Sequence, residues 1–562
     1  MGQSPASSLA PRRVFGIELA QVPWKRVQSA VTLNSRLDRA CYALALLLGI
    51  LPLWVGRHLP MVDLPQHLYL ISVLHRLDDP TTLYPQLFAQ RSQLTPYLGY
   101  YYAVSALHWL FPLLIANKIF LSAYVVGVPL SLALLLRSLG RPIWPSLLAL
   151  PFAYGDSFGW GFINFCAAIP LGFLCCAFFI RALSHAGQRA RWCACFSIAL
   201  VAVLLFHVQV FAFLGLALPI ILLTTRATDD GSRNPGTPAG AHWKAMLGRR
   251  LPALLALIPG VVLFFSWVVG RLGAPAQVEY GAPWKAWGPV LSSQNLSFKT
   301  FAQNREELPM VLANLLRDGT DRYPLFAVLT VFCVAVLASF FPAARDPRRE
   351  GPIARWRLLA LGLVALALYF TVPFDIRGYM YYLNTRFAHL AASLLVCAAP
   401  ALRERLQRPL LLAATACAAL LAIVLGRGFW SFDQLEAAQW DELAKHAAVR
   451  PMVLGLIFDP FSRISSHPVF LHSAAILALE RGGVPNFSFA ITPHSPLRYR
   501  GTPPPTFPSE WRPDQFRYEK EGGAYDHFLL RGISPAQVFG PLLDTQLLVT
   551  GKTRDFWLVS RR

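Results

Sequence analysis

Long apolar runs are the feature of this sequence that most constrains its fold. They recur along the chain with lengths of about 17–22 residues, which is what an α-helix needs to cross a hydrocarbon core of about 30 Å. The composition agrees, because 55% of the 562 residues are hydrophobic and only 14% are charged. A soluble protein has roughly a quarter charged residues. The sequence predicts an α-helical polytopic membrane protein with about 11–13 transmembrane helices.

The basic residues lie mostly in short segments between the apolar runs, although the net charge of +21 would also suit a nucleic-acid-binding protein. Three such segments are 244–250, 345–357 and 403–408. An excess of Lys and Arg in short loops is typical of the cytoplasmic side of a membrane protein. We therefore interpret the charge as a topology signal and expect no nucleic-acid partner.

The same signal divides the chain into three parts. Residues 1–36 are expected to form a cytoplasmic N-terminal segment, followed by a first helix that acts as an uncleaved signal anchor. Residues 37–427 are expected to form the transmembrane domain, with a first outer loop at 57–96 and another at 271–323. Residues 428–562 have mixed polar composition and alternating strand and helix patterns. They predict a small extracytoplasmic α/β domain.

Some of the expected spans are ambiguous. The run at 193–224 is too long for one straight crossing and is interrupted by His207, so it is either one kinked helix or two shorter ones. A lone histidine there is typical of a hydrogen bond between helices. The runs at 97–116 and 142–155 are interpreted as spans in their own right.

The polar stretch 56–80, directly after the first apolar run, contains the strongest candidate for chemistry. Asp63 lies between Pro60 and Pro65, near the membrane surface. A carboxylate there could take a proton from a hydroxyl, or hold a divalent cation against a phosphate. His67 follows four residues later, on the same face of a short helix expected to lie in the interface. The spacing leaves open that Asp63 only caps that helix.

Three further charged residues lie beside apolar runs. Asp156 occurs in a Gly-interrupted break, where an ionisable residue is a functional-site candidate, although an ordinary surface turn is the alternative. Arg377 and Arg386 flank the Tyr-rich segment "GYMYYLN". Arginine suits phosphate recognition and tyrosine suits stacking against sugars. The alternative is an aromatic belt with snorkelling arginines.

The layout of residues 37–426 resembles that of the C-type (GT-C) glycosyltransferases, in which an acidic first outer loop follows the first membrane helix. The segments "MVDLPQHL" and "GWGFINFCAAIPLGFLCC" resemble bacterial membrane proteins grouped with that superfamily. The resemblance implies a hexosyl- or pentosyltransferase of the bacterial inner membrane. Its donor would be a sugar on a polyprenyl phosphate lipid, and its acceptor a glycan, lipid or protein on the outer face.

The resemblance also implies roles for individual residues. Asp63 would match the catalytic acid of the first loop, as general base or as ligand of a divalent cation. Many family members have a paired acid in this loop, whereas here Leu64 follows, which leaves metal dependence open. Arg386 would contact the donor phosphate. His67, Asp156 and Arg377, which are candidates by their positions in the sequence, are the further expected substrate-binding residues.

Two other functions remain open from the sequence. One is a transporter or flippase of a lipid-linked or polar solute, with Asp156, His207 and Arg386 in broken helices. Such proteins are expected to contain an internal repeat, and none is visible here. The other is a non-catalytic envelope assembly protein that presents its outer α/β domain to partners.

Overall fold

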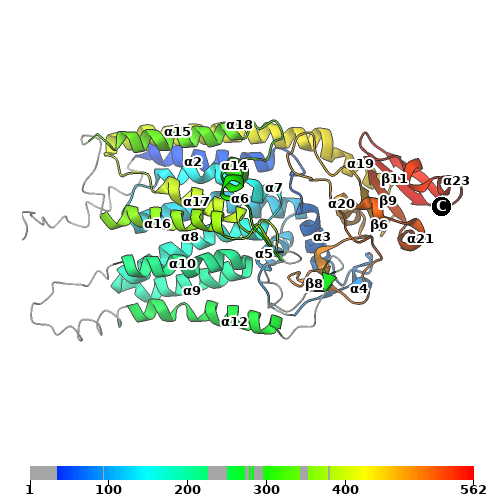
Figure 1. Ribbon diagram of the computed structural model, residues 1–562, viewed down its shortest axis with the longest axis horizontal. Coiled ribbons are helices and arrows are strands. Elements are labelled where there is room, and N and C mark those ends of the chain that lie inside the picture. The colour runs from blue at the N-terminus through cyan, green and yellow to red at the C-terminus, as the bar shows by residue number, and fades with distance from the viewer. Residues whose placement is uncertain are drawn as a thin grey trace, which may run out of the picture.

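A helical bundle and a sheet-containing C-terminal domain lie at opposite ends of the molecule (Figure 1). The computed structural model describes residues 35–92, 94–225, 248, 250–272, 278–279, 282–283, 295–341, 352–376 and 380–562. Arg377 and most of the predicted N-terminal segment therefore fall outside the described residues, as does much of the loop 271–323.

The bundle consists of apolar helices with outward-facing hydrophobic side chains. Its helices are α2 (Arg36–Ile50), α6 (Leu113–Ser138), α8 (Ile163–Ser184), α9 (Arg189–Phe206), α10 (Val208–Thr224), α12 (Ile258–Leu272), α15 (Arg322–Ala338), α16 (Pro352–Thr371), α17 (Thr385–Cys397) and α18 (Glu404–Phe432). Among the described residues, six helical segments are long and apolar enough to cross a membrane, and four more are shorter apolar helices. Large side chains such as Leu47, Ile198, Leu223 and Val269 are exposed on them. Exposed apolar surface of this extent marks contact with lipid. The predicted polytopic membrane fold is confirmed.

The ambiguous runs are now resolved. The run at 193–224 forms two helices, because the backbone of His207 is extended between α9 and α10. The run at 97–116 contains the ten-residue α5 (Gly99–His108) and the first residues of α6, which begins after Pro112, so the predicted single span does not form. The run at 142–155 forms the buried 3₁₀ helix η2 (Trp144–Tyr154), which contains two prolines that cannot donate α-helical hydrogen bonds.

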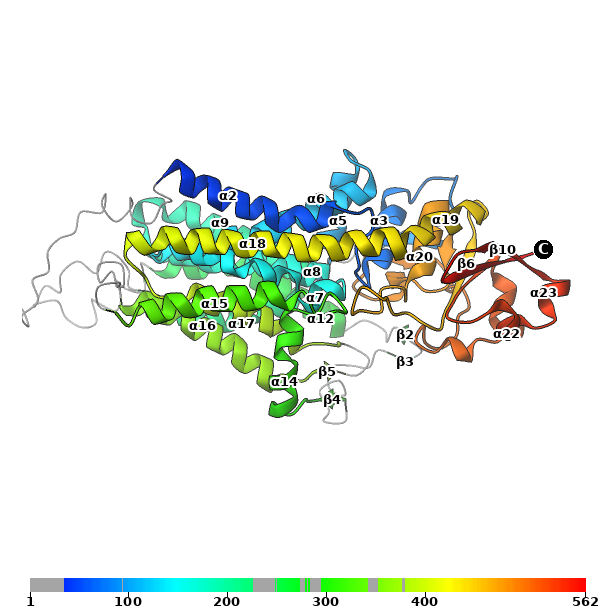
Figure 2. The ribbon, with the colours of Figure 1, turned by 90° about the horizontal axis from the view of Figure 1, so that it is seen from above.

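The helix α18 connects the bundle to the C-terminal domain. It continues through a π-helical turn, η4 (Asp433–Ala437), into α19 (Ala438–His446), which gives a helical segment of 43 residues. Figure 2 shows α18 running along the bundle towards the C-terminal sheet. The predicted domain boundary at 428 lies within this helix.

The C-terminal domain contains a five-stranded mixed sheet. Its strands are β6 (Met452–Ile457), β7 (Val484–Pro485), β9 (His527–Arg531), β10 (Leu547–Lys552) and β11 (Phe556–Arg561), in the order β10-β11-β9-β6-β7. β6 is parallel to β7 and β9, while β11 is antiparallel to β9 and β10. The helices α20 (Ser473–Arg481), α21 (Tyr518–Glu521), α22 (Pro535–Phe539) and α23 (Leu542–Thr545) complete it. The predicted C-terminal α/β fold is confirmed.

Several short elements complete the described part of the chain. They are α3 (Leu64–His75), α4 (Tyr84–Leu87), β1 (Phe88–Gln90), α5, α7 (Asp156–Gly159), α14 (Phe301–Leu312) and β8 (Leu497–Tyr499), with the strand pairs β2 (Val278–Glu279) with β3 (Ala282–Pro283) and β4 (Leu296–Ser297) with β5 (Asp375–Ile376). β1 of the first loop pairs antiparallel with β8 of the C-terminal domain. The predicted helix α3 forms, and its residues 64–73 are buried in protein.

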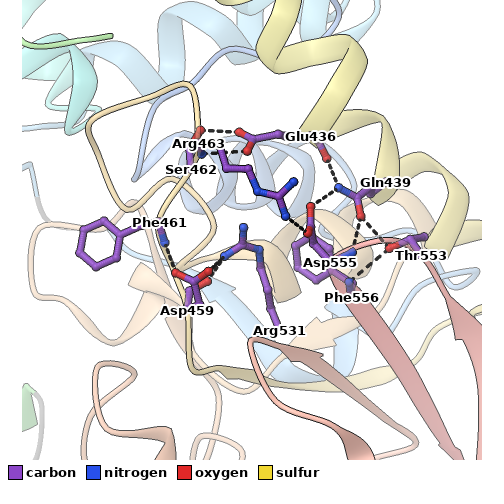
Figure 3. A network of polar contacts seen from close by, with 10 residues as sticks. All are labelled: Glu436, Gln439, Asp459, Phe461, Ser462, Arg463, Arg531, Thr553, Asp555 and Phe556. Carbon is purple, nitrogen blue, oxygen red and sulfur yellow. Dashed lines mark hydrogen bonds and ion pairs between the residues drawn. The ribbon is translucent and has the colours of Figure 1, made fainter. Parts of the chain in front are cut away.

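A polar network ties the end of α18 to the loop that follows β6 (Figure 3). The buried Glu436 carboxylate accepts hydrogen bonds from the Ser462 hydroxyl and from the Arg463 backbone N–H at 2.8 Å. The Gln439 side-chain amide donates a hydrogen bond to the Asp555 carboxylate at 2.9 Å. This carboxylate also forms an ion pair with Arg463. These contacts fix the loop whose later residues reach the bundle.

Candidate functional site

A cavity of about 660 Å³ lies where the bundle, the first loop and the C-terminal domain meet. Asp63, His67, Asn164, His207, Arg386, His472, His494 and Glu510 line it, with an aromatic wall that includes Tyr97, Tyr101, Trp160, Phe162 and Tyr382. Three of the predicted site residues, Asp63, His67 and Arg386, therefore line one cavity, although Arg386 is far from the other two in the sequence. A large cavity with a few convergent polar groups is the usual form of a ligand site.

The carboxylate of Asp63 faces this cavity. Asp63 occupies the N-cap position of α3, but its side chain makes no capping hydrogen bond. Its backbone N–H donates to the carbonyl of Trp160 at 3.1 Å, and Gly161 packs directly against it. Gly161 has φ of +84°, and a Cβ there would lie 2.9 Å from the Asp63 nitrogen. The capping alternative is therefore not seen, and the carboxylate is available for other contacts.

The closest ionisable partner of Asp63 comes from the C-terminal domain. His472 Nε2 lies 3.4 Å from Asp63 Oδ1, and His472 Nδ1 lies 3.3 Å from Glu510 Oε1. Burial lowers the pKa of His472, but the two carboxylates outweigh it and raise the pKa to about 10. Burial also raises the pKa of Glu510. At neutral pH His472 is an imidazolium held between two carboxyl groups.

His67 lines the cavity, but both of its ring nitrogens contact protein atoms. Nε2 lies 3.1 Å from the carbonyl oxygen of Gly161, and Nδ1 lies 2.8 Å from the hydroxyl of Tyr101. A carbonyl only accepts, so Nε2 donates and Nδ1 accepts from the tyrosine. Burial lowers the pKa of His67 to about 4, which keeps the ring neutral. His67 thus holds α3 against the segment that supports Asp63.

Arg386 is a buried cation in the cavity wall. Its guanidinium donates to His207 Nε2 at 3.0 Å and to the Tyr381 carbonyl at 3.3 Å, and it lies 4.3 Å from the centre of the Phe162 ring. Among the described residues its Nε has no hydrogen-bond partner, and Asp63 interacts with the guanidinium electrostatically without a direct contact. A buried cation whose Nε–H is left without an acceptor is costly, so this arrangement favours an anionic ligand.

Asp156 does not line the cavity. Its Oδ1 lies 2.9 Å from Nε2 of the buried His467, and it thereby joins α7 to the loop that follows β6. Gly159 leaves room for the His467 imidazole, because a Cβ at this glycine would lie 2.3 Å from His467 Cε1. The structure brings Asp63, His67 and Arg386 together, puts Asp156 in a separate contact, and does not describe Arg377.

Two of the cavity-lining tyrosines have strained backbones. Tyr97 and Tyr382 have φ of 75° and 56°, a region that residues other than glycine rarely adopt. The Tyr382 ring lies 4.7 Å from Trp160, and the Tyr97 ring lies 4.7 Å from His207. Backbone strain persists where the surroundings determine it strongly and is concentrated at ligand sites. These rings provide an aromatic face beside the two charged groups.

The residues around Asp63 do not fit a divalent cation. Such a cation needs several oxygen ligands that converge on one point. Here Asp63 and Glu510 face opposite nitrogens of the His472 ring, and that ring is cationic. In the part of the chain that the structure describes, no cluster of three or more His, Cys, Asp or Glu side chains could hold a metal ion.

His472 and Glu510 were missed from the sequence. The segment 467–483 has a helical apolar pattern, and His472 lies just before the helix that this pattern correctly predicts. Glu510 lies in a Pro-rich loop whose composition indicates only irregular structure. The presence of two histidines, His467 and His472, at the start of that segment was the only available signal. No spacing rule relates them to acids several hundred residues earlier.

Comparison with known proteins identifies the fold. No protein family model matches the chain, and no curated protein sequence matches it. The chain is similar to ArnT from Cupriavidus metallidurans, with a TM-score of 0.53 over 93% of this chain and 97% of that one. This holds for the structure bound to undecaprenyl phosphate, at 12% identity, and for the apo state, at 14%.

Arabinofuranosyltransferase AftD from Mycobacteria also matches, with a TM-score of 0.46 and 14% identity. That match covers 94% of this chain and 40% of AftD. At identities this low the likeness to ArnT shows a shared fold. The chain shares the fold of ArnT over nearly its whole length, in keeping with the resemblance that the sequence suggests.

Proposed function

We propose that the protein is a membrane glycosyltransferase that moves a sugar from a polyprenyl phosphate donor to an acceptor hydroxyl. One observation carries the proposal: a single cavity is lined by the Asp63 carboxylate and by the buried Arg386 guanidinium, whose Nε has no hydrogen-bond partner among the described residues. Such a site can hold a phosphate at one end and a hydroxyl at the other. The bound undecaprenyl phosphate of ArnT, a protein of the same fold, is consistent with a lipid phosphate donor here.

In the proposed reaction, Asp63 takes the proton of the acceptor hydroxyl as its oxygen attacks the anomeric carbon. The bond between that carbon and the phosphate oxygen breaks, and the polyprenyl phosphate leaves as an anion. Arg386 stabilises the negative charge that develops on this phosphate. The rings of Trp160 and Tyr382 offer an apolar face against which a sugar can pack.

The proposed orientation places this cavity on the outer side of the inner membrane. The support comes from the basic segments at 244–250, 345–357 and 403–408, which the positive-inside rule assigns to the cytoplasm. The first loop and residues 428–562 would then be extracytoplasmic, and residues 1–36 cytoplasmic. Cysteine labelling from outside intact cells tests this orientation. The transporter alternative is less well supported, because Asp156 does not join His207 and Arg386 in the cavity.

The experiment uses the full chain reconstituted in lipid nanodiscs. Undecaprenyl phosphates linked to a panel of radiolabelled hexoses and pentoses serve as donors, and a bacterial envelope extract serves as acceptor. We expect sugar transfer and release of undecaprenyl phosphate with at least one donor. Absence of transfer with every donor, in protein that is folded and binds undecaprenyl phosphate, would contradict the proposal.

A further inference from the structure

Four arginines, called here the arginine cluster, lie at the end of the bundle that is away from the cavity. Arg137 is in the last turn of α6, Arg181 is in the last turn of α8, and Arg189 and Arg191 are in the first turn of α9. These helix ends are neighbours, because α8 packs against both α6 and α9. Asn164, at the start of α8, lines the cavity, and Arg181 lies about 26 Å further along this helix. The arginine cluster is therefore near the opposite surface of the membrane.

The indole ring of Trp192 holds two of these cations in place. The guanidinium of Arg181 lies 4.6 Å from the centre of this ring, and that of Arg191 lies 5.2 Å from it. The ring is itself stacked on Phe178 at 5.9 Å, and Arg181 Nε donates a hydrogen bond to the Ser138 hydroxyl at 2.8 Å. Topology alone predicts arginines in such a loop but not their packing on one ring. The cations are thus held at defined positions.

The charge of the arginine cluster is not compensated by the protein. Arg137 and Arg191 both repel Arg181 electrostatically. In the part of the chain that the structure describes, no carboxylate forms an ion pair with any of the four arginines. Arg137 and Arg191 are exposed and Arg181 is half-buried, so an anion can approach them from outside the protein. Such an anion would offset the repulsion and accept charge-assisted hydrogen bonds.

The surface next to the arginine cluster is apolar, which indicates where such an anion comes from. Ile198 follows Arg191 by two helical turns and so lies on the same face of α9. Ile198 is 72% exposed, and α9 is one of the helices long and apolar enough to cross a membrane. An acyl chain that packs along this face ends in a headgroup beside Arg191. A lipid anion therefore fits this surface better than a free one.

We propose that the arginine cluster binds the phosphate headgroup of an anionic membrane lipid. A planar guanidinium matches two oxygens of one phosphate, and Arg181 and Arg191 both present theirs beside the Trp192 ring. The acyl chains of this lipid lie along α9. The site is separate from the cavity and does not depend on the proposed sugar transfer.

Native mass spectrometry of the full chain, freed of copurified lipid in a neutral detergent, measures this binding. The probes are dioleoylphosphatidylglycerol, dioleoylphosphatidylcholine and inorganic phosphate, all at one ionic strength. We expect the anionic lipid to bind at least about tenfold more tightly than the zwitterionic one, because several arginines contribute to its binding. An excess of inorganic phosphate should leave most of the bound phosphatidylglycerol in place.

Variants test whether these particular arginines form the site. Arg181→Gln and Arg191→Gln should each weaken phosphatidylglycerol binding about fivefold, the contribution of one arginine near an anionic headgroup. Arg191→Lys keeps the charge and should bind within about twofold of the wild type. Arg408→Gln is the matched control, since it removes the same charge at the start of α18, at the same end of the bundle, where Arg408 lies 3.7 Å from Asp38. This control should bind as the wild type does.

Four results would overturn the proposal. Phosphatidylcholine that binds as tightly as phosphatidylglycerol would show that the site does not select an anion. Equal weakening in Arg408→Gln would show that only the net charge of the protein acts. An equal loss in Arg191→Lys and Arg191→Gln would assign the effect to packing. Displacement of the lipid by inorganic phosphate would assign the arginine cluster to a free anion. None of these measurements requires sugar transfer, so a failure of the proposed function is seen separately.

Discussion

Two aspartate–histidine pairs join the bundle to the C-terminal domain, and they differ in what surrounds them. In both, an acid near the end of the bundle contacts a histidine from the segment between β6 and α20. The Asp63–His472 pair lines the cavity and continues to Glu510. The Asp156–His467 pair lies outside the cavity lining, and Nδ1 of its buried histidine has no hydrogen-bond partner among the residues that the structure describes. The same two residue types therefore suit chemistry at one position and attachment at the other.

The largest expected effect is that of Asp63→Asn. An amide keeps the size of the carboxylate but cannot take the acceptor's proton. We expect kcat for sugar transfer to fall by about 10²- to 10⁴-fold, the range of general base catalysis. Binding of undecaprenyl phosphate, followed by intrinsic fluorescence, should remain within a few-fold of the wild type. Transfer at the wild-type rate would remove Asp63 from the mechanism.

Arg386→Gln should have the next largest effect, because it removes the cation proposed to stabilise the leaving phosphate. We expect kcat to fall by about 10²- to 10³-fold, as when one charge-stabilising donor is lost, and affinity for undecaprenyl phosphate to fall with it. Arg531 offers a matched control, since it is also buried and lies 4.2 Å from the Phe470 ring, but pairs with Asp459 outside the cavity. Arg531→Gln should lower thermal stability and leave donor affinity unchanged. Equal losses of affinity in both variants would contradict the proposed phosphate site.

A smaller effect is expected from two glycines, one beneath each pair. Gly161→Ala puts a Cβ against the Asp63 backbone at a positive φ, so Asp63 must move, and misplacement by about 1 Å can cost roughly 10²-fold in rate. Gly159→Ala displaces His467 instead and should cost about 1–3 kcal/mol of stability as overpacking does. Transfer kinetics and thermal unfolding of both variants check this contrast. A larger loss of transfer rate in Gly159→Ala than in Gly161→Ala would contradict the proposed difference between the two pairs.

The smallest effect concerns pH. The folded-state pKa of His472 is raised to about 10 from its ordinary 6.5, so the protonated ring favours the folded state. This contribution is fully present below pH 6.5 and is lost as the pH rises through about 10. The difference in unfolding temperature between the wild type and His472→Gln should therefore shrink from pH 6 to pH 10.5. A difference that grows with pH would contradict the Asp63–His472–Glu510 arrangement.

The sequence predicted the membrane fold and part of the site for identifiable reasons. The length of the apolar runs alone predicts helices such as α8 and α18. Asp63 was found because it is the acidic residue that follows the first predicted span. Prolines and short breaks prevent η2 and α5 from forming full membrane spans. Hydropathy reports how apolar a segment is and does not predict where its helical backbone ends. His472 reaches Asp63 only because β1 pairs with β8 and α3 packs on α20. Contacts between segments so distant in the chain leave no periodic signal.

The central claim is that Asp63 serves the chemistry whereas Asp156 serves attachment of the C-terminal domain. The most direct measurement compares Asp63→Asn and Asp156→Asn in the same nanodisc preparation, by single-turnover release of undecaprenyl phosphate and by thermal unfolding. We predict that Asp63→Asn abolishes release in protein that still unfolds cooperatively, although loss of the charged contact with His472 lowers its unfolding temperature. Asp156→Asn should lower the unfolding temperature and retain release within a few-fold. Fast release from Asp63→Asn, or loss of release without destabilisation in Asp156→Asn, would contradict this account.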